Sequence, residues 1–96
     1  MAVYFVVQEK VTDQDGMDAY GKAAGPTLAG MRVKPLIVDN DVQEIEGEWH
    51  GSRLVVLEFE DEAAFREWYD SPAYVEAREL RFAASDSRGV LAKGLG

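Results

Sequence analysis

The sequence contains no cysteine and a single histidine, His50. The absence of cysteine excludes a disulfide framework, a thiolate nucleophile and a cysteine zinc site. The stretch DQDGMD at residues 13–18 lacks the next alternating ligand and the distal glutamate of a calcium loop, so we interpret it as helix capping. The chain carries no phosphate-binding glycine loop, nucleophile elbow or paired-histidine motif, and its one histidine falls in an expected loop, which argues against haem. We therefore predict neither a cofactor nor a metal site.

Basic residues are also in short supply, and no apolar run is long. Ten Lys and Arg side chains stand against 18 Asp and Glu, which gives a formal net charge of −8. A field of this sign repels the phosphates of nucleic acids and anionic membrane surfaces. The N-terminal run AVYFVV is too short for a signal-peptide core, and no segment reaches the ~20 apolar residues of a membrane span. We expect a cytoplasmic protein with neither nucleic acid nor a membrane as a partner.

Strand and helix patterns alternate along the 96 residues, a length that fits one domain over residues 1–96. β-branched and aromatic runs predict strands, and capping residues before apolar positions at helical spacing predict helices. Pro35 should confine the second strand to a sheet edge or a bulge. The order is that of the split βαβ, so we predict an α+β, ferredoxin-like fold with both helices on one face of an antiparallel sheet. The strands are expected at 2–9, 31–38, 42–46, 53–60 and 90–94, and the helices after Thr12 or Asp13 and after Asp61.

The first expected helix is poor by intrinsic propensity. Gly16, Gly21 and Gly25 each cost about 1 kcal/mol relative to alanine. Pro26 should kink the helix near Lys22, because proline lacks a donor and clashes with the preceding turn. Tertiary packing is therefore expected to hold this helix in place.

The two strongest strands are apolar on both faces. In the first strand, one face carries Val3, Phe5 and Val7, and the other carries Tyr4, Val6 and Gln8. A sheet with helices on one face should be polar on the other, and a chain of this length has no spare element to cover it. The simplest cover is a second copy packed sheet against sheet. We predict a homodimer in which the less apolar set, Tyr4, Gln8 and Glu58, faces the space between the sheets.

Two residues near the strand at 53–60 are candidates for chemistry. His50 follows Trp49 and precedes Arg53, which is either the rim of a pocket with an acid or base and an anion-holding arginine, or a solvated loop. With one histidine in the chain, the solvated loop is the simpler interpretation. Glu58 is either a carboxylate paired with an arginine at the sheet edge or a general base in an apolar cavity, and the sequence favours neither.

Aromatic and basic side chains recur in the second half of the chain. Trp68, Tyr69 and Tyr74 fall at helical spacing, which is more typical of a core stripe than of a ligand cage. Arg78 and Arg81 follow Tyr74 by one and two turns. They form either a solvated face or, less commonly, an anion site.

Several segments resemble the bacterial family called domain of unknown function 1330. They are YFVVQEKVTD, PTLAG, RLVVLEF, WYDSPAYVEARELR and a terminal AKG, of which the most specific positions are Tyr69, Ser71, Pro72, Tyr74, Ala77, Leu80 and Arg81. Arg53 also matches the family. The chain departs from the family pattern in the second strand, at Glu60-Asp61 and at Lys93. The resemblance implies a dimeric α+β barrel, a superfamily that includes cofactor-independent monooxygenases, isomerases, haem-handling enzymes and plain binding proteins.

These observations lead to one functional hypothesis and one alternative. The hypothesis is a homodimer that binds a small organic molecule in the barrel or in the cleft between sheet and helices. Catalysis would be cofactor-independent, by proton transfer or oxidation, with Glu58 as the base. The alternative is a non-catalytic dimer that binds a metabolite or a partner protein, so the enzyme question stays open. The ligand-binding candidates are Arg53 and Arg81 as anion-holding groups, Tyr4, Trp68 and Tyr74 as lining, and His50 at the rim.

Overall fold

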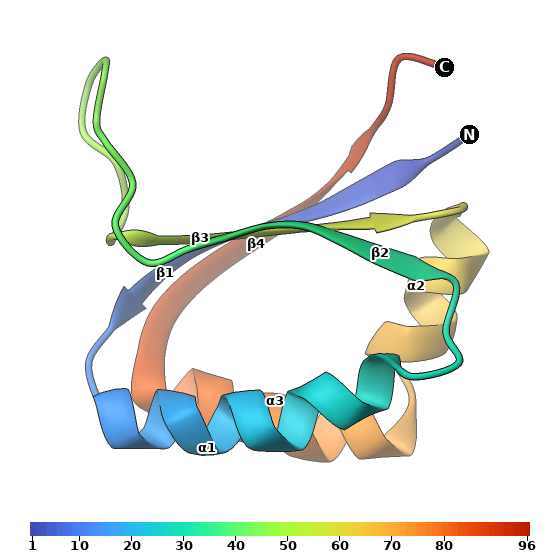
Figure 1. The fold of residues 1–96 in the computed structure, drawn as a ribbon, viewed down its shortest axis with the longest axis horizontal. Coiled ribbons are helices and arrows are strands. Elements are labelled where there is room, and N and C mark those ends of the chain that lie inside the picture. The colour runs from blue at the N-terminus through green and yellow to red at the C-terminus, as the bar shows by residue number, and fades with distance from the viewer.

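The computed structural model describes all residues 1–96 and arranges them as one four-stranded sheet with helices on one face (Figure 1). The strands lie in the order β2-β3-β1-β4, and each neighbouring pair is antiparallel. The predicted α+β, ferredoxin-like fold is therefore confirmed. The elements in chain order are β1 (Val3–Val11), α1 (Gln14–Ala24), the 3-10 helix η1 (Gly25–Leu28), β2 (Val33–Asp39), β3 (Arg53–Phe59), α2 (Glu62–Tyr69), α3 (Pro72–Ala84) and β4 (Ser85–Lys93).

The helix starts follow the capping residues of the sequence. Asp13, Asp61 and Ser71 occupy the N-cap positions of α1, α2 and α3, and each side chain accepts a hydrogen bond from a backbone N–H of the first turn. Pro26 does not kink α1 near Lys22. Instead α1 ends at Ala24 and the chain continues as η1, with Pro26 in its first turn. The backbone N–H groups of a first helical turn have no acceptor within the helix, so the N–H that proline lacks is not missed there.

Two strand predictions were wrong. Residues 42–46 form no strand, because β2 is the edge of the sheet and the segment after Asp39 has no further strand to pair with. The strand expected only at 90–94 begins at Ser85, directly after α3, and pairs with the whole of β1 from Val11 back to Val3. The polar run SDSRG thus belongs to an edge strand, where alternate residues face solvent. Pro35 sits at a register shift in β2, as predicted.

The core lies between the inner face of the sheet and the helices. Every second residue of β1 points into it, so Val3, Phe5 and Val7 are buried while Tyr4 and Val6 are only half-buried. Trp68 of α2, with other aromatic rings of the helices, packs on this inner face. The remaining large core residues are Leu57, Phe59, Phe65 and Tyr74.

The outer face of the sheet has no helix over it. Figure 1 shows the loop at 40–52 and the C-terminal end rising on this side, away from the helices. The pairing register aligns an aliphatic row across all four strands on this face: Ile37, Val56, Val6 and Val90. Its two ends are open to solvent, with Ile37 42% and Val90 61% exposed. No helix of the structure has the length and apolar character needed to cross a bilayer.

The loop at 40–52 depends on one glycine. Gly51 has a φ of 74°, and a Cβ at this position would lie 2.2 Å from the backbone oxygen of Glu9. We expect Gly51→Ala to lower the free energy of unfolding by more than about 2 kcal/mol, since it adds both a strained backbone and a collision with a strand. Gly47→Ala is the matched control: its φ is 67°, but a Cβ there would meet nothing within 4 Å.

Urea denaturation of the two variants measures the difference. The control should cost only about 1 kcal/mol, from the left-handed backbone alone. Equal losses for Gly51→Ala and Gly47→Ala would contradict the close packing of this loop on β1.

Candidate functional site

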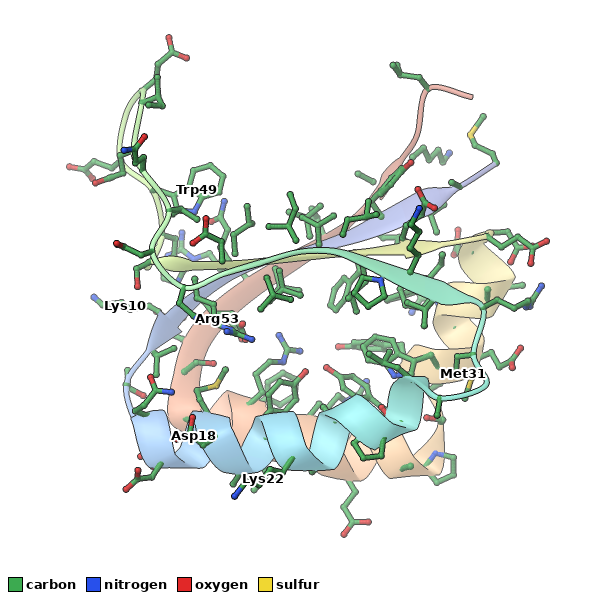
Figure 2. The ribbon with its side chains drawn as sticks, viewed as in Figure 1. Lys10, Asp18, Lys22, Met31, Trp49 and Arg53 are labelled. Atoms are coloured by element: carbon green, nitrogen blue, oxygen red, sulfur yellow. The ribbon has the colours of Figure 1, made fainter.

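A pocket of about 230 Å³ lies between the inner face of the sheet and the helices. Every helix and strand except β4 contributes to its walls. Figure 2 shows Arg53 directed from the sheet toward α1, with Trp49 on the opposite side of the sheet. Most of the lining is apolar, but five of its residues carry charge or a phenol: Glu9, Tyr20, Arg53, Tyr74 and Arg81. The other lining residues are Phe5, Val7, Gly21, Ala24, Gly25, Leu28, Pro35, Val38, Val55, Leu57 and Trp68.

The polar end of the pocket is a row of side chains that crosses the sheet. Glu9 of β1 is paired in register with Arg53 of β3 and with Ser87 of β4, so the three share the inner face. The Arg53 Nε donates to Oε1 of Glu9 at 2.8 Å, and its Nη1 also donates to the Oδ1 of Asn40. Glu9 is only 1% exposed. A buried carboxylate is tolerated where it is paired and hydrogen-bonded, which Arg53 achieves for one of its two oxygens.

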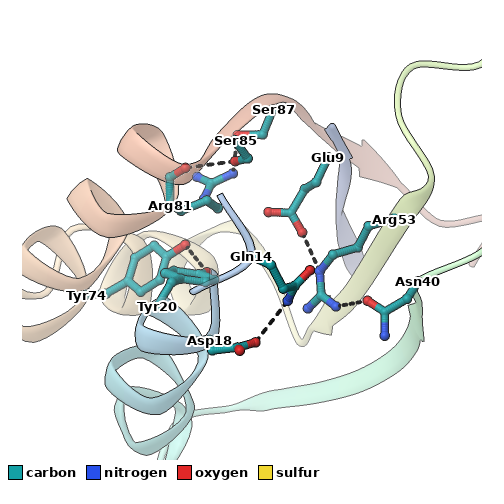
Figure 3. A network of polar contacts seen from close by, with 10 residues as sticks. All are labelled: Glu9, Gln14, Asp18, Tyr20, Asn40, Arg53, Tyr74, Arg81, Ser85 and Ser87. Atoms are coloured by element: carbon teal, nitrogen blue, oxygen red, sulfur yellow. Dashed lines mark hydrogen bonds and ion pairs between the residues drawn. The ribbon is translucent and has the colours of Figure 1, made fainter. Parts of the chain in front are cut away.

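Arg81 approaches the same row from α3. Its side chain is 4% exposed, and its Nη1 donates to the Ser87 Oγ at 3.2 Å (Figure 3). It takes part in no salt bridge of the structure. Its Nε has no hydrogen-bond partner, and neither does Oε2 of Glu9. Figure 3 places Glu9 between Arg81 and Arg53. Buried polar atoms without partners are rare in proteins and mark places where a ligand or water completes the bonding.

Two tyrosines complete the polar end. The hydroxyls of Tyr20 on α1 and Tyr74 on α3 lie 2.9 Å apart. Burial is the main cause that raises the pKa of Tyr20 far above its usual value, and the Tyr74 hydroxyl adds to the effect. Burial also raises the pKa of Tyr74, although the nearby Arg81 guanidinium partly offsets it. Both phenols are therefore neutral hydrogen-bonding groups at any ordinary pH.

Trp68 lines the pocket from α2 and is only 2% exposed. Its ring packs on Tyr74 with 3.9 Å between centroids, and its Nε1 donates to the Oγ1 of Thr27 at 2.9 Å. The hydroxyl of Thr27 in turn bonds to the backbone oxygen of Ala24. This chain of contacts fixes the indole plane and links α2 to the end of α1.

Four of the residues predicted from the sequence meet in this pocket. Arg53, Arg81, Trp68 and Tyr74 all line it. Sequence reasoning missed Glu9 and Tyr20. Glu9 continues the inward-facing alternation of Val3, Phe5 and Val7 by one more step, so extending that pattern to the end of the strand would have found it. Tyr20 falls at helical spacing with the apolar residues Met17 and Ala24, which indicates only a buried position on the first helix.

The other three predicted residues lie elsewhere. Tyr4 and Glu58 are cross-strand partners on the outer face, where the neighbouring Glu58 carboxylate raises the pKa of Tyr4. They cannot reach the pocket, because the sheet separates them from it. His50 lies in the loop at 40–52, and its Nε2 is 2.7 Å from the backbone oxygen of Asp86, so it ties the loop to the start of β4. No cluster of three His, Asp or Glu side chains that could hold a metal ion is formed.

Comparison with known proteins gives a family match and a set of similar folds. The family model described as Domain of unknown function (DUF1330) matches residues 2–95. No protein with a curated description matches the chain in sequence.

Solved structures share the fold at low sequence identity. A protein of unknown function from Rhodopseudomonas palustris has a TM-score of 0.83 at 23% identity, with 99% of this chain and 83% of that chain covered. The cofactor-independent oxygenase SnoaB from Streptomyces nogalater has a TM-score of 0.70 at 18% identity, with 99% and 94% covered. A dimeric ferredoxin-like protein of unknown function from Jannaschia sp. CCS1 has a TM-score of 0.72 at 18% identity, with 98% and 100% covered. At these identities the likeness shows the fold alone.

The tyrosine pair predicts a pH dependence of stability. In the folded protein both phenols have a raised pKa, whereas in the unfolded chain they ionise near the usual 10.0. Their contribution is fully present below pH 10 and is lost as the pH rises above it, because the unfolded state then releases protons that the folded state retains. Above pH 10, each such tyrosine should lower the free energy of unfolding by as much as about 1.4 kcal/mol for every pH unit.

Urea denaturation between about pH 9 and pH 11 of wild type and Tyr20→Phe measures the effect. The variant should show a shallower fall. Leu28→Ala serves as the control, since it weakens the same part of the core without removing a titratable group. If Tyr20→Phe and wild type lose stability with the same slope, the phenol is not held protonated by its surroundings.

Proposed function

The chain belongs to the DUF1330 family, and we propose that it acts as a homodimer that binds a small organic molecule in the pocket between the sheet and the helices. One observation carries the proposal. The pocket has apolar walls and a buried polar end at which a carboxylate oxygen and a guanidinium nitrogen lack partners. Concave, mostly apolar sites with a few convergent polar groups are the usual form of small-molecule sites in proteins.

The dimer half of the proposal rests on the outer face of the sheet. The aliphatic row across the four strands has no cover within the chain, and three of the similar folds, among them the Jannaschia protein, are described as dimeric. Packing two such faces together gives the dimeric α+β barrel. Lys34 and Tyr4 flank Glu58 in register on this face, so in such a dimer Glu58 lies in the interface between a cation and a phenol.

Binding without turnover is the function that the pocket itself supports. Glu58, the base expected from the sequence, lies on the other side of the sheet. Within the pocket, Glu9 is bonded to Arg53 through one oxygen and leaves its second oxygen without a partner, and the lining contains no serine, threonine or histidine nucleophile. The polar end is thus built to hold charge and hydrogen bonds in place. A cytoplasmic location stays a prediction.

A charge placed in the aliphatic row should dissociate the dimer. Val56 lies at the centre of the row, between Val6 and Ile37, so Val56→Glu would bury a carboxylate without a partner in the interface. A cost of about 3 kcal/mol or more corresponds to a dissociation constant raised by at least about 100-fold. Sedimentation velocity at micromolar concentration measures it. Val75→Glu is the control, because it makes the same change on an exposed position of α3.

Wild type and the Val75→Glu control should sediment as dimers, and Val56→Glu should sediment as a monomer. A wild-type monomer at micromolar concentration would overturn the dimer. A dimeric Val56→Glu would place the interface on another surface.

Native mass spectrometry of freshly purified protein tests the pocket. We expect a dimer that carries additional small-molecule mass, which disappears when the protein is denatured. The indole N–H resonances of the two tryptophans in an NMR spectrum give a second measurement. Trp68 lines the pocket and should respond to a bound probe, whereas Trp49 lies on the opposite side of the sheet and should not. A protein that retains no small molecule, and whose Trp68 indole resonance does not respond to aromatic probes, contradicts the pocket as a binding site.

A further inference from the structure

The charges in the pocket do not balance. Two guanidinium groups, Arg53 and Arg81, and one carboxylate, Glu9, form its polar end. Glu9 is bonded to Arg53, which leaves one positive charge on Arg81 without a carboxylate partner. Because Arg81 is 4% exposed, water does little to solvate this charge, and an unpaired buried charge is costly. A ligand with one negative charge would neutralise it.

The groups around Arg81 suit an anionic head group. The Nε of Arg81 is a free donor, and the hydroxyls of Tyr20 and Tyr74 carry two protons, of which their mutual hydrogen bond uses only one. The second proton is available to an acceptor on a ligand. Arg81 therefore combines with a neutral phenol pair to offer donors to one small region of the pocket. Guanidinium groups are the side chains best suited to carboxylates, since they can donate two parallel hydrogen bonds.

The rest of the pocket suits an apolar, flat body. Leu28, Val55 and Leu57 line it with aliphatic carbon, and Trp68 presents a ring whose orientation is fixed by Thr27. An aromatic ligand ring can pack against such an indole in an offset or edge-on arrangement.

The pocket meets solvent between α1 and β2. Its exposed lining residues are Gly21 and Gly25 on the helix and Pro35 and Val38 on the edge strand. A Cβ added at Gly21 or Gly25 would meet nothing within 4 Å, so these glycines border open space and no packing contact requires them. Gly21, inside α1, costs the helix about 1 kcal/mol relative to alanine, whereas Gly25 lies just past the end of α1. An open entrance gives that cost a function.

From these four observations we propose that the ligand is a small organic acid with a flat apolar body and a single anionic head group. It enters between α1 and β2 past Gly21 and Gly25, its head group pairs with Arg81, and its body lies against Trp68. This inference rests on the proposed small-molecule binding by the same pocket and adds the chemical class of the ligand, its orientation and its route of entry.

Three probes with one aromatic body and different head groups test the ligand class. They are 2-naphthylacetate, 2-naphthylacetamide and 2-(2-naphthyl)ethylamine, which carry a negative charge, no charge and a positive charge. Nitrogen–proton correlation spectra of the full chain follow the two indole resonances during each titration. We expect the Trp68 indole to shift and the Trp49 indole to stay, and the acid to bind at least tenfold more tightly than the amide or the amine.

Variants of the wild-type chain test the orientation and the route. Arg81→Met should weaken the acid at least tenfold and leave the amide nearly unchanged, and Arg81→Lys should restore part of the preference. Gly21→Leu should weaken all three probes at least tenfold while raising helix propensity, because the new side chain occupies the entrance. Ala19→Leu places the same side chain at an exposed position of α1 outside the pocket, and should bind the probes like wild type.

Each outcome has a separate meaning. If no probe shifts Trp68, the proposed binding function itself fails. If the amide or the amine binds as tightly as the acid, the pocket binds small molecules but the ligand class is wrong. If Gly21→Leu binds the acid as tightly as Ala19→Leu does, the entrance is elsewhere. Should Arg81→Met not fold, the head-group preference of the wild-type chain still decides the ligand class.

Discussion

Glu9 and Arg53 lie directly opposite each other on the two central strands, on the face that the helices cover, and the guanidinium bonds the carboxylate at 2.8 Å. A slip of the β1–β3 pairing by one residue would move Glu9 away from Arg53 and leave a buried carboxylate without a partner. The same slip would turn Val3, Phe5 and Val7 to the outer face. The ion pair and the hydrophobic alternation therefore specify the same register. They also put a polar row at one end of an otherwise apolar face, which is why the pocket has a polar end at all.

α1 and the η1 turn that follows it together carry three glycines, for two different reasons. At Gly16 a Cβ would lie 2.8 Å from the Cβ of Ala84, so glycine there allows α1 to approach the end of α3. At Gly21 and Gly25 there is no neighbour, and the missing side chains leave space beside β2. Intrinsic helix propensity alone would treat all three glycines as equally destabilising. Packing separates them into one that brings two helices together and two that keep a pocket open, and the helix is held by its contacts with the core.

The architecture could be predicted from the sequence because it follows from local patterns. Period-two alternation in the first strand and capping residues such as Asp61 and Ser71 are local signals, and each corresponds to an element of the structure. The strand expected at 42–46 was wrong because a strand needs a neighbouring strand to pair with. β2 is the edge of the sheet, and no local sequence pattern indicates that no strand lies beyond it. The early start of β4 was missed for the converse reason: the polar run SDSRG pairs with β1 along a solvent-exposed edge.

The candidate site was only partly predictable, because a site is a set of residues brought together by the register. Arg53, Arg81, Trp68 and Tyr74 were identified one by one from residue type and spacing, and the structure brings them together. Tyr4 and Glu58 were expected on the face toward the second sheet, and their even-numbered positions do place them on the outer face, away from the other four. Because alternate residues of a strand point to opposite faces, the sequence alone already shows that Glu58 and Arg53 lie on opposite faces of the sheet. Glu9 was missed because the inward alternation was followed only through its hydrophobic members.

The net charge of −8 does not conflict with a pocket for an anion. Charges on the surface act through water and mobile ions, and beyond about 10 Å they are largely screened at ordinary ionic strength. Inside the pocket the effective dielectric constant is lower, so one unpaired guanidinium outweighs many distant carboxylates. The surface charge instead affects the rate of approach, because it repels an anion. The groove next to the pocket is lined by two cations, Lys22 and Arg53, and one carboxylate, Asp18. In the proposed complex, selectivity for an acid comes from the desolvated interior, and the acidic surface slows the capture of that acid.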